Sequence, residues 1–273
     1  NIANVLRDQG RYDEALEKFE IALAKGDDPH LLGNRALTLQ HAGRVDEALA
    51  DYRAALSLTP DDVILHNNLS HALLIYGHFE EGWSSFERRL KDPELAGLGV
   101  GIDAPRWMGE PLDGKSILLC YEQGLGDAIQ FIRFTTDLCA RGADVTVACP
   151  PRLHRLFKGA KDIVQLVSSD PPYPKCDFWS PLLSLPGLLG TALEDYTAAV
   201  PYLSPEPALV DRWTSSLETD RSRRVGIAWQ GNPDYQGDHA RSIPLRYLWP
   251  TIDRPEIAYF SLQKGTGADQ LAP

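Results

Sequence analysis

Residues 115–134, with the sequence KSILLCYEQGLGDAIQFIRF, decide the fold of the second part of this chain of 273 residues. A short apolar run, Ile117–Leu119, is followed by Gly124 and Gly126, and apolar residues return at helical spacing over Ala128–Phe134. This order predicts a buried β-strand, a tight glycine turn and an α-helix. Such a turn gathers free backbone N–H groups and the positive end of a helix at one place.

Asp127 lies at the start of the expected helix. We expect it to be the N-cap residue, which accepts backbone N–H bonds and stays ionised. One interpretation is a structural cap, because Asp is among the commonest N-cap residues; the other is a catalytic base at the carboxyl edge of a parallel sheet, where open α/β folds place their ligands. A dinucleotide-binding fingerprint is a weaker match, because Ile129 stands in place of the third glycine.

Composition and charge exclude several classes of protein. The length suits two or three domains, and 43% hydrophobic with 24% charged residues excludes a wholly disordered chain. The formal net charge of −11 argues against nucleic acid or an anionic membrane as the partner of the whole chain. No CxxC pair is present, so neither a zinc site nor a disulfide framework is predicted, and reduced thiols in a cytoplasmic protein are expected. The cysteines are Cys120, Cys139, Cys149 and Cys176.

No signal peptide or membrane-spanning segment is predicted. No apolar run approaches the roughly 18 residues that are needed to cross a bilayer, so an integral membrane protein is not expected. The sequence starts at Asn1 in the middle of a pattern, without an initiator Met. We therefore expect a fragment of a longer protein.

The first ninety or so residues contain an internal repeat. Segments that begin at Gly10, Gly43 and Gly77 read GRYDEAL, GRVDEAL and GHFEEGW, so the period is 33 and then 34 residues. This period resembles that of the tetratricopeptide repeat, a helix–turn–helix unit that buries its apolar face only by stacking on its neighbours. We therefore predict such repeats over 1–92. Small residues at Ala15, Ala22, Ala48 and Ala55 and aromatic residues at Phe19, Tyr52 and Phe86 recur with the period.

The third repeat departs from the first two. It has Gly82 and Trp83 in place of Ala-Leu and a basic end at Arg88–Arg89. Capping repeats are often atypical, so we expect the array to end here and to be followed by a Gly- and Pro-rich linker over 93–113. Trp83 and Trp107 are interpreted as packing anchors between the array and the next domain.

Asparagine recurs at one position of the repeats. Asn1, Asn34 and Asn68 are equivalent in the three units. An amide donates and accepts hydrogen bonds, so stacked asparagines can hold the backbone of an extended peptide of any sequence. This series resembles the asparagine ladder of the nucleocytoplasmic O-linked N-acetylglucosamine transferases. The alternative is that asparagine serves local packing at this repeat position.

The remaining chain alternates strands and helices. This alternation predicts a parallel sheet covered on both faces over 114–204, and a second β/α unit over 205–273 with too few strands for an independent domain. The expected strands are 117–119, 145–149, 163–167, 176–179, 224–229 and 256–262. The expected helices are 128–140, 153–157, 208–218 and one that begins with Ser242 as its cap and Pro244 in its first turn.

Five segments, in this order behind the repeats, carry a resemblance to a known family. They are PRWMGEPLDGKSILLCYEQGLGDAIQF, PLLSLP, RVGIAWQGNP, RSIPL and SLQKG. Together they resemble the bacterial repeat-linked glycosyltransferases of the heptosyltransferase-like GT-B group. The resemblance implies an α + α/β fold in which the repeats precede two facing Rossmann-like domains. It also implies an acceptor side in the first domain, a nucleotide-sugar donor on the second, and no essential metal or cofactor.

The resemblance assigns roles to individual residues. The Gly-Asp pair of heptosyltransferases falls at Gly126 and Asp127, which implies that Asp127 is the general base, with Gly124 in the same substrate-binding turn. Their diphosphate-binding lysine falls at Arg241, which keeps the positive charge but leaves the identity of the donor open.

Three further residues complete the donor side. Gly231 and Asn232 would line the same loop as Arg241, and Lys264, on the following loop, is a second candidate contact to the diphosphate. For Arg241 and Lys264 the alternative is a solvated surface charge.

Together these features predict an inverting, metal-independent glycosyltransferase that moves a sugar from a nucleotide-sugar to an acceptor hydroxyl. A carboxylate would take the hydroxyl proton, and cationic groups would stabilise the leaving nucleoside diphosphate. The repeats favour a protein or peptide as the acceptor. The alternative is a non-catalytic adaptor whose α/β part is a degenerate scaffold. A nicotinamide oxidoreductase is disfavoured, because Cys149–Arg152 offers no acidic residue for the ribose.

Overall fold

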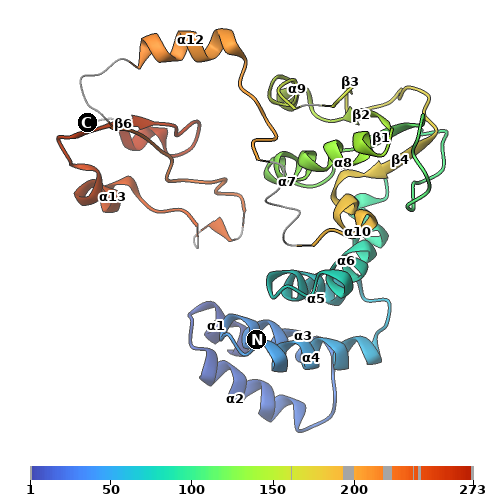
Figure 1. Cartoon of the computed structure of the whole chain (residues 1–273). Coiled ribbons are helices and arrows are strands. Elements are labelled where there is room, and N and C mark those ends of the chain that lie inside the picture. Colours follow the sequence, from blue (N-terminus) through green and yellow to red (C-terminus); the bar gives the residue numbers. More distant parts are fainter. Residues whose placement is uncertain are drawn as a thin grey trace. The chain divides into compact units, whose positions relative to one another are not determined.

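The computed structural model describes residues 2–160, 162–192, 200–217, 223–235, 237–238 and 241–271 (Figure 1). The chain divides into two compact units, Asn1–Pro205 and Glu206–Pro273. Asn1, the first member of the asparagine series, lies outside the described residues. No helix in the described ranges is long and apolar enough to cross a membrane.

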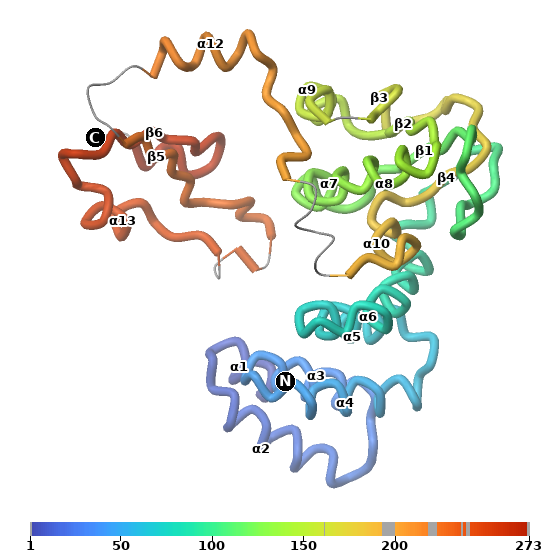
Figure 2. The backbone as a smooth tube through the Cα atoms, viewed as in Figure 1, coloured from blue at the N-terminus to red at the C-terminus, as the bar shows by residue number. Residues whose placement is uncertain are grey.

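Six helices form the repeats at the beginning of the first unit. Each packs against the next along the chain, as Figure 2 shows, so the prediction of helical repeats is confirmed. The helices are α1 (Ile2–Asp8), α2 (Tyr12–Leu23), α3 (Pro29–His41), α4 (Val45–Leu58), α5 (Val63–Ile75) and α6 (Phe79–Phe86).

The repeated glycines and two aspartates define the helix ends. Gly10, Gly43 and Gly77 have φ angles of 76°, 77° and 85°, a left-handed conformation that glycine adopts without a steric penalty. Each therefore ends the first helix of its repeat. The Asp28 carboxylate caps α3 by accepting the His30 and Leu31 N–H groups at 2.8 and 3.0 Å. Asp62 caps α5 in the same way.

The periodic residues of the array form its core. Ala15, Ala55, Phe19 and Tyr52 are completely buried. Ala22, at the same position as Ala55, is only half-buried. Small residues at these positions allow the helices to approach each other, as the period predicts.

A four-stranded parallel sheet follows the repeats. Its strands are β1 (Ser116–Cys120), β2 (Asp144–Ala148), β3 (Gln165–Val167) and β4 (Phe178–Pro181). The order is β3-β2-β1-β4, and each neighbouring pair is parallel. This is the order of the first four strands in the classic doubly wound fold, whose ligand crevice lies where the strand order reverses. Here the reversal lies between β1 and β4.

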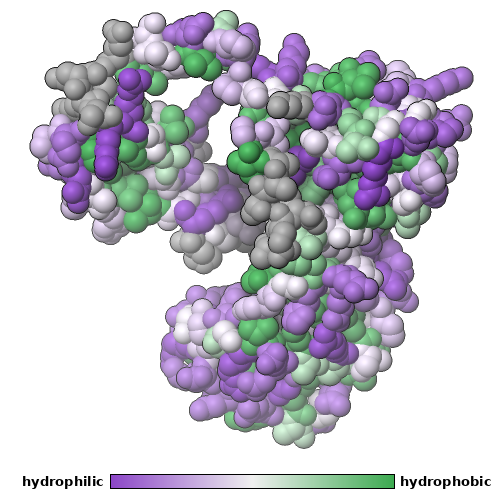
Figure 3. All heavy atoms as spheres, viewed as in Figure 1, coloured by the Kyte–Doolittle hydropathy of each residue, from purple (hydrophilic) through white to green (hydrophobic). Residues whose placement is uncertain are grey.

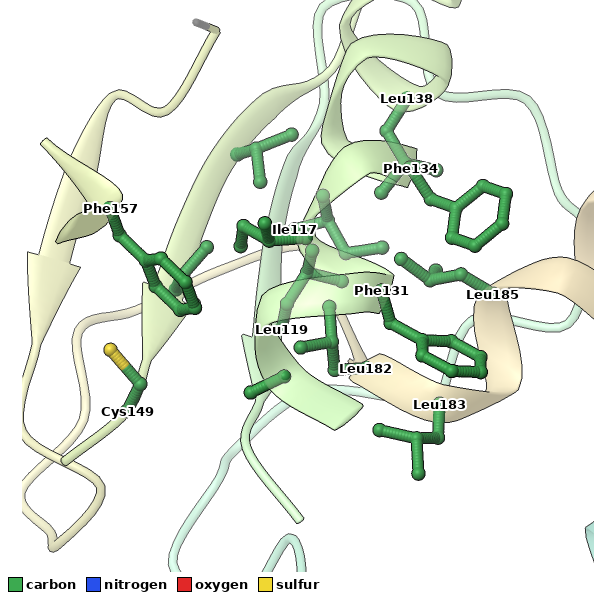
Figure 4. Packing of buried hydrophobic residues seen from close by; sticks show 14 of the residues in the cluster. Ile117, Leu119, Phe131, Phe134, Leu138, Cys149, Phe157, Leu182, Leu183 and Leu185 are labelled. Atoms are coloured by element: carbon green, nitrogen blue, oxygen red, sulfur yellow. The ribbon is translucent and has the colours of Figure 1, made fainter. Parts of the chain in front are cut away.

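Helices cover one face of this sheet. They are α7 (Leu125–Phe131), the 3₁₀ turn η3 (Ile132–Phe134), α8 (Thr135–Ala140) and α9 (Pro151–Phe157). Figure 4 shows Ile117 and Leu119 of β1 packed against Phe131, Phe134 and Leu138. The single helix expected over 128–140 is therefore wrong in two respects. It begins earlier, and it is broken where the Thr135 hydroxyl donates to the Ile132 carbonyl, a local bond that competes with regular helix.

The other face of the sheet is covered by irregular chain. Leu118 and Cys120 of β1 face this side and pack against Leu98 and Ile102, which belong to the segment expected to be a linker. Trp179 also lies here, and its ring touches the backbone of Gly99 so closely that an added Cβ would be 2.4 Å away. The linker therefore takes the place of a covering helix.

The unusual residues of the third repeat have two different packing roles. A Cβ at Gly82 would lie 2.8 Å from the Leu74 side chain, so glycine allows α6 to approach α5. Trp83 packs edge-on against the Phe131 ring of α7, with 6.0 Å between the ring centroids. Trp107 is fully buried in the sheet core. Packing roles for both tryptophans are confirmed.

Short helical segments join these parts. They are η1 (Glu87–Lys91) and η2 (Pro93–Leu95) after the repeats, and η4 (Leu182–Ser184) and α10 (Leu185–Leu189) after β4. Helix α10 contacts α6 of the third repeat.

The second unit contains a two-stranded parallel sheet. Its elements are α12 (Pro207–Ser216), β5 (Arg223–Ile227), α13 (Leu245–Ile252), β6 (Ile257–Ser261) and the 3₁₀ turn η6 (Ala268–Leu271). The expected cap of α13 is wrong. Pro244 occupies the N-cap, and the Ser242 hydroxyl instead bonds to Asp238 and Gly231.

Candidate functional site

Asp127 lies in the first turn of α7, directly beyond the carboxyl end of β1. The N-cap is Gly124, and Asp127 is the third helical residue, so its expected N-cap position is wrong. Its Oδ2 accepts the Gly124 N–H at 3.1 Å. A Cβ at Gly124 would lie 2.7 Å from this oxygen, so glycine is required for the carboxylate to fold back. Within the described part of the chain, Oδ1 has no hydrogen-bond partner.

The surroundings of the turn are open. Gly124 and Gly126 are exposed, Asp127 is half-buried, and nothing lies within 4 Å of where a Gly126 Cβ would be. The turn therefore places a carboxylate oxygen without a partner in the described part of the chain in the first turn of a helix.

His71 of α5 brings the third repeat to this carboxylate. Desolvation lowers the pKa of His71, and the negative charge of Asp127 opposes that shift. The two side chains are therefore near enough for their charges to interact. The His71 ring also lies 6.1 Å from the Phe86 ring, although its own surface is largely exposed. His71 is a candidate residue that the sequence did not reveal.

A buried ion pair lies beyond the carboxyl ends of β1 and β4. Glu122 follows β1 and is completely buried, and the Arg89 guanidinium reaches it from η1 with two hydrogen bonds of 2.8 and 3.0 Å. Glu122 also accepts the Leu183 N–H at 3.0 Å, and Arg89 donates to Ser184 at 3.0 Å. These bonds connect η1 to the segments that follow β1 and β4.

A second ion pair extends this network. Arg106 donates to Glu87, which also accepts from Arg89 at 3.0 Å. Burial alone would raise the pKa of Glu87, but the hydrogen bond from Arg106 and the charge of Arg89 outweigh it and hold this pKa below its ordinary value. The network joins the end of the repeats to the sheet through charged groups.

The two asparagines of the series that the structure describes differ in their hydrogen bonds. The Asn34 amide is already bonded within the array, because it donates to the His30 carbonyl at 2.7 Å and accepts from Arg7 at 3.4 Å. The Asn68 side chain is half-buried and has no hydrogen-bond partner among the described residues. Asn68 is therefore the better placed of the two to bind a peptide backbone.

Asn68 belongs to a mixed face of α5. Ile64, Asn68, His71 and Ile75 share one side of the helix by their spacing, and Ile64 and Ile75 are 72% and 67% exposed. In Figure 3 the visible surface of the repeats is mainly hydrophilic, with smaller apolar areas. This face offers two apolar contacts around an amide and an imidazole.

The expected donor residues lie at one edge of the second unit. Gly231, Asn232 and Arg241 are in the loop after β5, and Lys264 is in the loop after β6. Gln263 joins the two loops, because its Oε1 accepts the Trp229 and Gln230 N–H groups at 3.0 Å each and its Nε2 donates to the Gln230 carbonyl. Parallel strands place these loops together, as expected.

The individual donor candidates differ in their contacts. The Asn232 side chain accepts the Asp234 N–H at 3.2 Å and forms a local turn. Lys264 is exposed, and its amine has no partner in the described ranges. Arg241 is half-exposed and bonds to Asp238 at 3.2 Å. No group of three or more His, Cys, Asp or Glu side chains that could hold a metal ion is found among the described residues.

Comparison with known proteins tests the repeats. A family model described as tetratricopeptide repeat matches residues 1–63. These residues are tetratricopeptide repeats. Arrays of this kind present concave surfaces that bind peptides and proteins, so a protein-binding role for the repeats is supported.

One similar protein matches most of the chain. Protein FlbA of Caulobacter vibrioides is 29% identical over 221 residues, which cover 73% of this chain and 37% of that protein. The chain thus spans little more than a third of this relative, whose name states no activity.

Solved structures are similar to about a third of the chain. The Sgt2 TPR domain from Aspergillus fumigatus is 21% identical, covers 36% of this chain and 63% of its own, and has a TM-score of 0.32. The Yersinia enterocolitica chaperone SycD in complex with a YopD peptide is 18% identical, covers 36% and 79%, and has a TM-score of 0.33.

Proposed function

We propose that this chain carries part of an inverting, metal-independent glycosyltransferase that transfers a sugar from a nucleotide-sugar to a hydroxyl of a protein held by the repeats. The observation that carries the proposal is the position of Asp127. One of its carboxylate oxygens is fixed by the Gly124 N–H, and the other has no hydrogen-bond partner in the described part of the chain.

This geometry suits a general base. The acceptor O–H attacks the anomeric carbon, its proton passes to the free oxygen of Asp127, and the bond between that carbon and the diphosphate breaks with its electron pair on the leaving phosphate. A single displacement of this kind inverts the anomeric carbon. The bond from the Gly124 N–H orients the carboxylate.

The repeats support a protein as the acceptor. His71 lies on the same face of α5 as Asn68 and also interacts with the charge of Asp127. A peptide bound along this face therefore has a short path from the repeat surface to the candidate base. The donor is assigned to the second unit, where Arg241 and Lys264 supply positive charge beside parallel strand ends, as a diphosphate requires.

The test is Asp127→Asn in the full-length protein. Asn keeps an oxygen for the Gly124 N–H, so the free energy of unfolding should change by less than about 1 kcal/mol. It is not a base, so the release of nucleotide from an accepted nucleotide-sugar should fall by roughly 100-fold or more, with unchanged donor affinity.

The matched control is Asp92→Asn. Asp92 accepts the Glu94 N–H at 2.9 Å as a cap outside the site, so this variant should keep full turnover. Normal turnover in Asp127→Asn would refute the role of base. If a panel of UDP-, GDP-, ADP- and CMP-sugars yields no turnover in wild type while a protein partner binds the repeats, the adaptor function replaces the proposed one.

A further inference from the structure

The loop after β5 is held by one buried carboxylate, that of Asp238. Its Oδ1 accepts the Ser242 hydroxyl at 2.7 Å and the Arg241 Nε–H at 3.2 Å. The Ser242 oxygen in turn accepts the Gly231 N–H at 2.9 Å. Through these hydrogen bonds, the Gly231 backbone and the Arg241 side chain are both held by the Asp238 carboxylate.

Gly231 is in direct contact with this group. A Cβ at this position would lie 2.6 Å from Asp238 Oδ1 and 2.8 and 2.9 Å from Arg241 Nε and Nη2. The guanidinium therefore lies against the bare backbone, and any side chain at 231 would displace it. This contact explains why glycine stands here, although its φ angle is not in the left-handed region.

The outer part of Arg241 remains available. Its Cζ lies 4.6 Å from the centre of the Tyr235 ring, which supports one face of the guanidinium. Asp238 uses only Nε, and the two terminal nitrogens have no acceptor among the described residues. A guanidinium fixed at Nε keeps its terminal N–H donors in one orientation, with Nη2 beside Gly231, and such donors pair with phosphate oxygens.

We infer that Asp238, through Ser242 and Gly231, is the positioning residue that aims the terminal nitrogens of Arg241 at the diphosphate of the donor. The inference rests on the proposed function. It adds a specific prediction about charge. A carboxylate beside an anion site repels the anion, so removing it would strengthen binding if charge alone mattered. If Asp238 positions Arg241, loss of its oxygens weakens binding in spite of the lost negative charge.

The experiment measures the affinity of the full chain for inorganic pyrophosphate by calorimetry at low salt. Arg241→Ala should weaken binding by about 10- to 100-fold, because charge-assisted bonds are lost. Asp238→Ala should weaken it by about 5-fold or more. Asp238→Asn, which keeps an oxygen for Ser242 and Arg241 but lacks the charge, should bind at least as tightly as wild type.

Two further variants complete the design. Ser242→Ala changes no charge and removes only one hydroxyl, so it should disturb the fold less than Asp238→Ala. It should weaken pyrophosphate binding by about 3-fold, and it tests the inference if Asp238→Ala does not fold. Arg246→Ala is the matched control, because Arg246 also stacks on a tyrosine, Tyr247 at 4.8 Å, but has no ion pair to a carboxylate in the described ranges. It should leave pyrophosphate affinity unchanged.

The outcomes separate two failures. If Arg241→Ala weakens binding but Asp238→Ala and Ser242→Ala do not, Asp238 does not position Arg241, and the diphosphate site of the proposed function stands. If Arg241→Ala itself changes nothing, the donor site is not at this loop, and the inference falls with it.

Discussion

Replacing Arg89 tests whether the third repeat and the parallel sheet form one cooperative structure. Arg89 is 3% exposed and makes five hydrogen bonds: two to Glu122 and one each to Ser184, Glu87 and the Phe86 carbonyl. Arg89→Met keeps much of the side-chain volume and removes all five. Glu122 then stays buried as a carboxylate without its cation.

The expected loss in the free energy of unfolding is large for a single substitution. Removing one partner of a buried ion pair costs about 3–5 kcal/mol, because the remaining charge is uncompensated. For a domain of roughly 150–250 residues, this corresponds to a fall in Tm of about 6–20 °C. Arg88→Ala is the adjacent control. Arg88 is largely exposed and lies 3.8 Å from Asp61, so its loss should cost about 0–1 kcal/mol.

The double variant Arg89→Met with Glu122→Gln tests whether the unpaired charge of Glu122 causes the loss of stability. Gln has no charge to bury, and its oxygen still accepts the Leu183 N–H, so the double variant should recover about 2 kcal/mol or more relative to Arg89→Met. Urea unfolding followed by tryptophan fluorescence and by circular dichroism measures all four proteins. Equal stabilities of Arg89→Met and Arg88→Ala, or no recovery in the double variant, would contradict the role of this ion pair.

Two other predictions concern the repeats and the acid stability of the first unit. Replacing Asn34 and Asn68 by Ala should weaken the binding of a protein partner to the repeats without unfolding them. The expected loss of binding free energy is about 0.5–1.5 kcal/mol from Asn68 and less from Asn34, because Asn34 bonds within the array. An unchanged affinity, measured by fluorescence anisotropy, would show that these asparagines do not hold a peptide. The pKa of Glu87 is lowered in the folded protein, so its contribution to stability is complete above its ordinary value of 4.5 and is lost as the pH falls through the folded value. Acid titration of unfolding should therefore show a shallower loss of stability below about pH 4.5 in Glu87→Gln than in wild type, and identical profiles would count against the ion pair.

The elements of the fold were predictable where a local period specifies them. The repeats follow from glycines and small residues that recur every 33 or 34 positions, and the strand at Ile117–Leu119 follows from its apolar run. The start of α7 was misplaced because Gly124 and Asp127 both satisfy the rules for a helix start. Only the reach of the carboxylate back to the Gly124 N–H decides between them.

The missed parts of the site depend on contacts between distant segments. Arg89 and Glu122 are 33 residues apart, and neither stands in a motif, so their pairing follows only from the packing of η1 on the sheet. Asp238 stands in a loop that looked merely polar. It accepts a hydrogen bond from Ser242, which helix-start rules assign to a cap. Arg241 and Lys264 could be placed at one edge because both follow parallel strands.

Because the third repeat is attached to the sheet domain, the array can change in length only at its other end. Its Trp83 and Arg89 contact the sheet domain, through Phe131 and Glu122. Repeats can therefore be exchanged or added upstream of α5 without disturbing Asp127, but not at the sheet end. The third repeat is the fixed end of the array, and the number of units before it sets the length of the concave surface that the array presents.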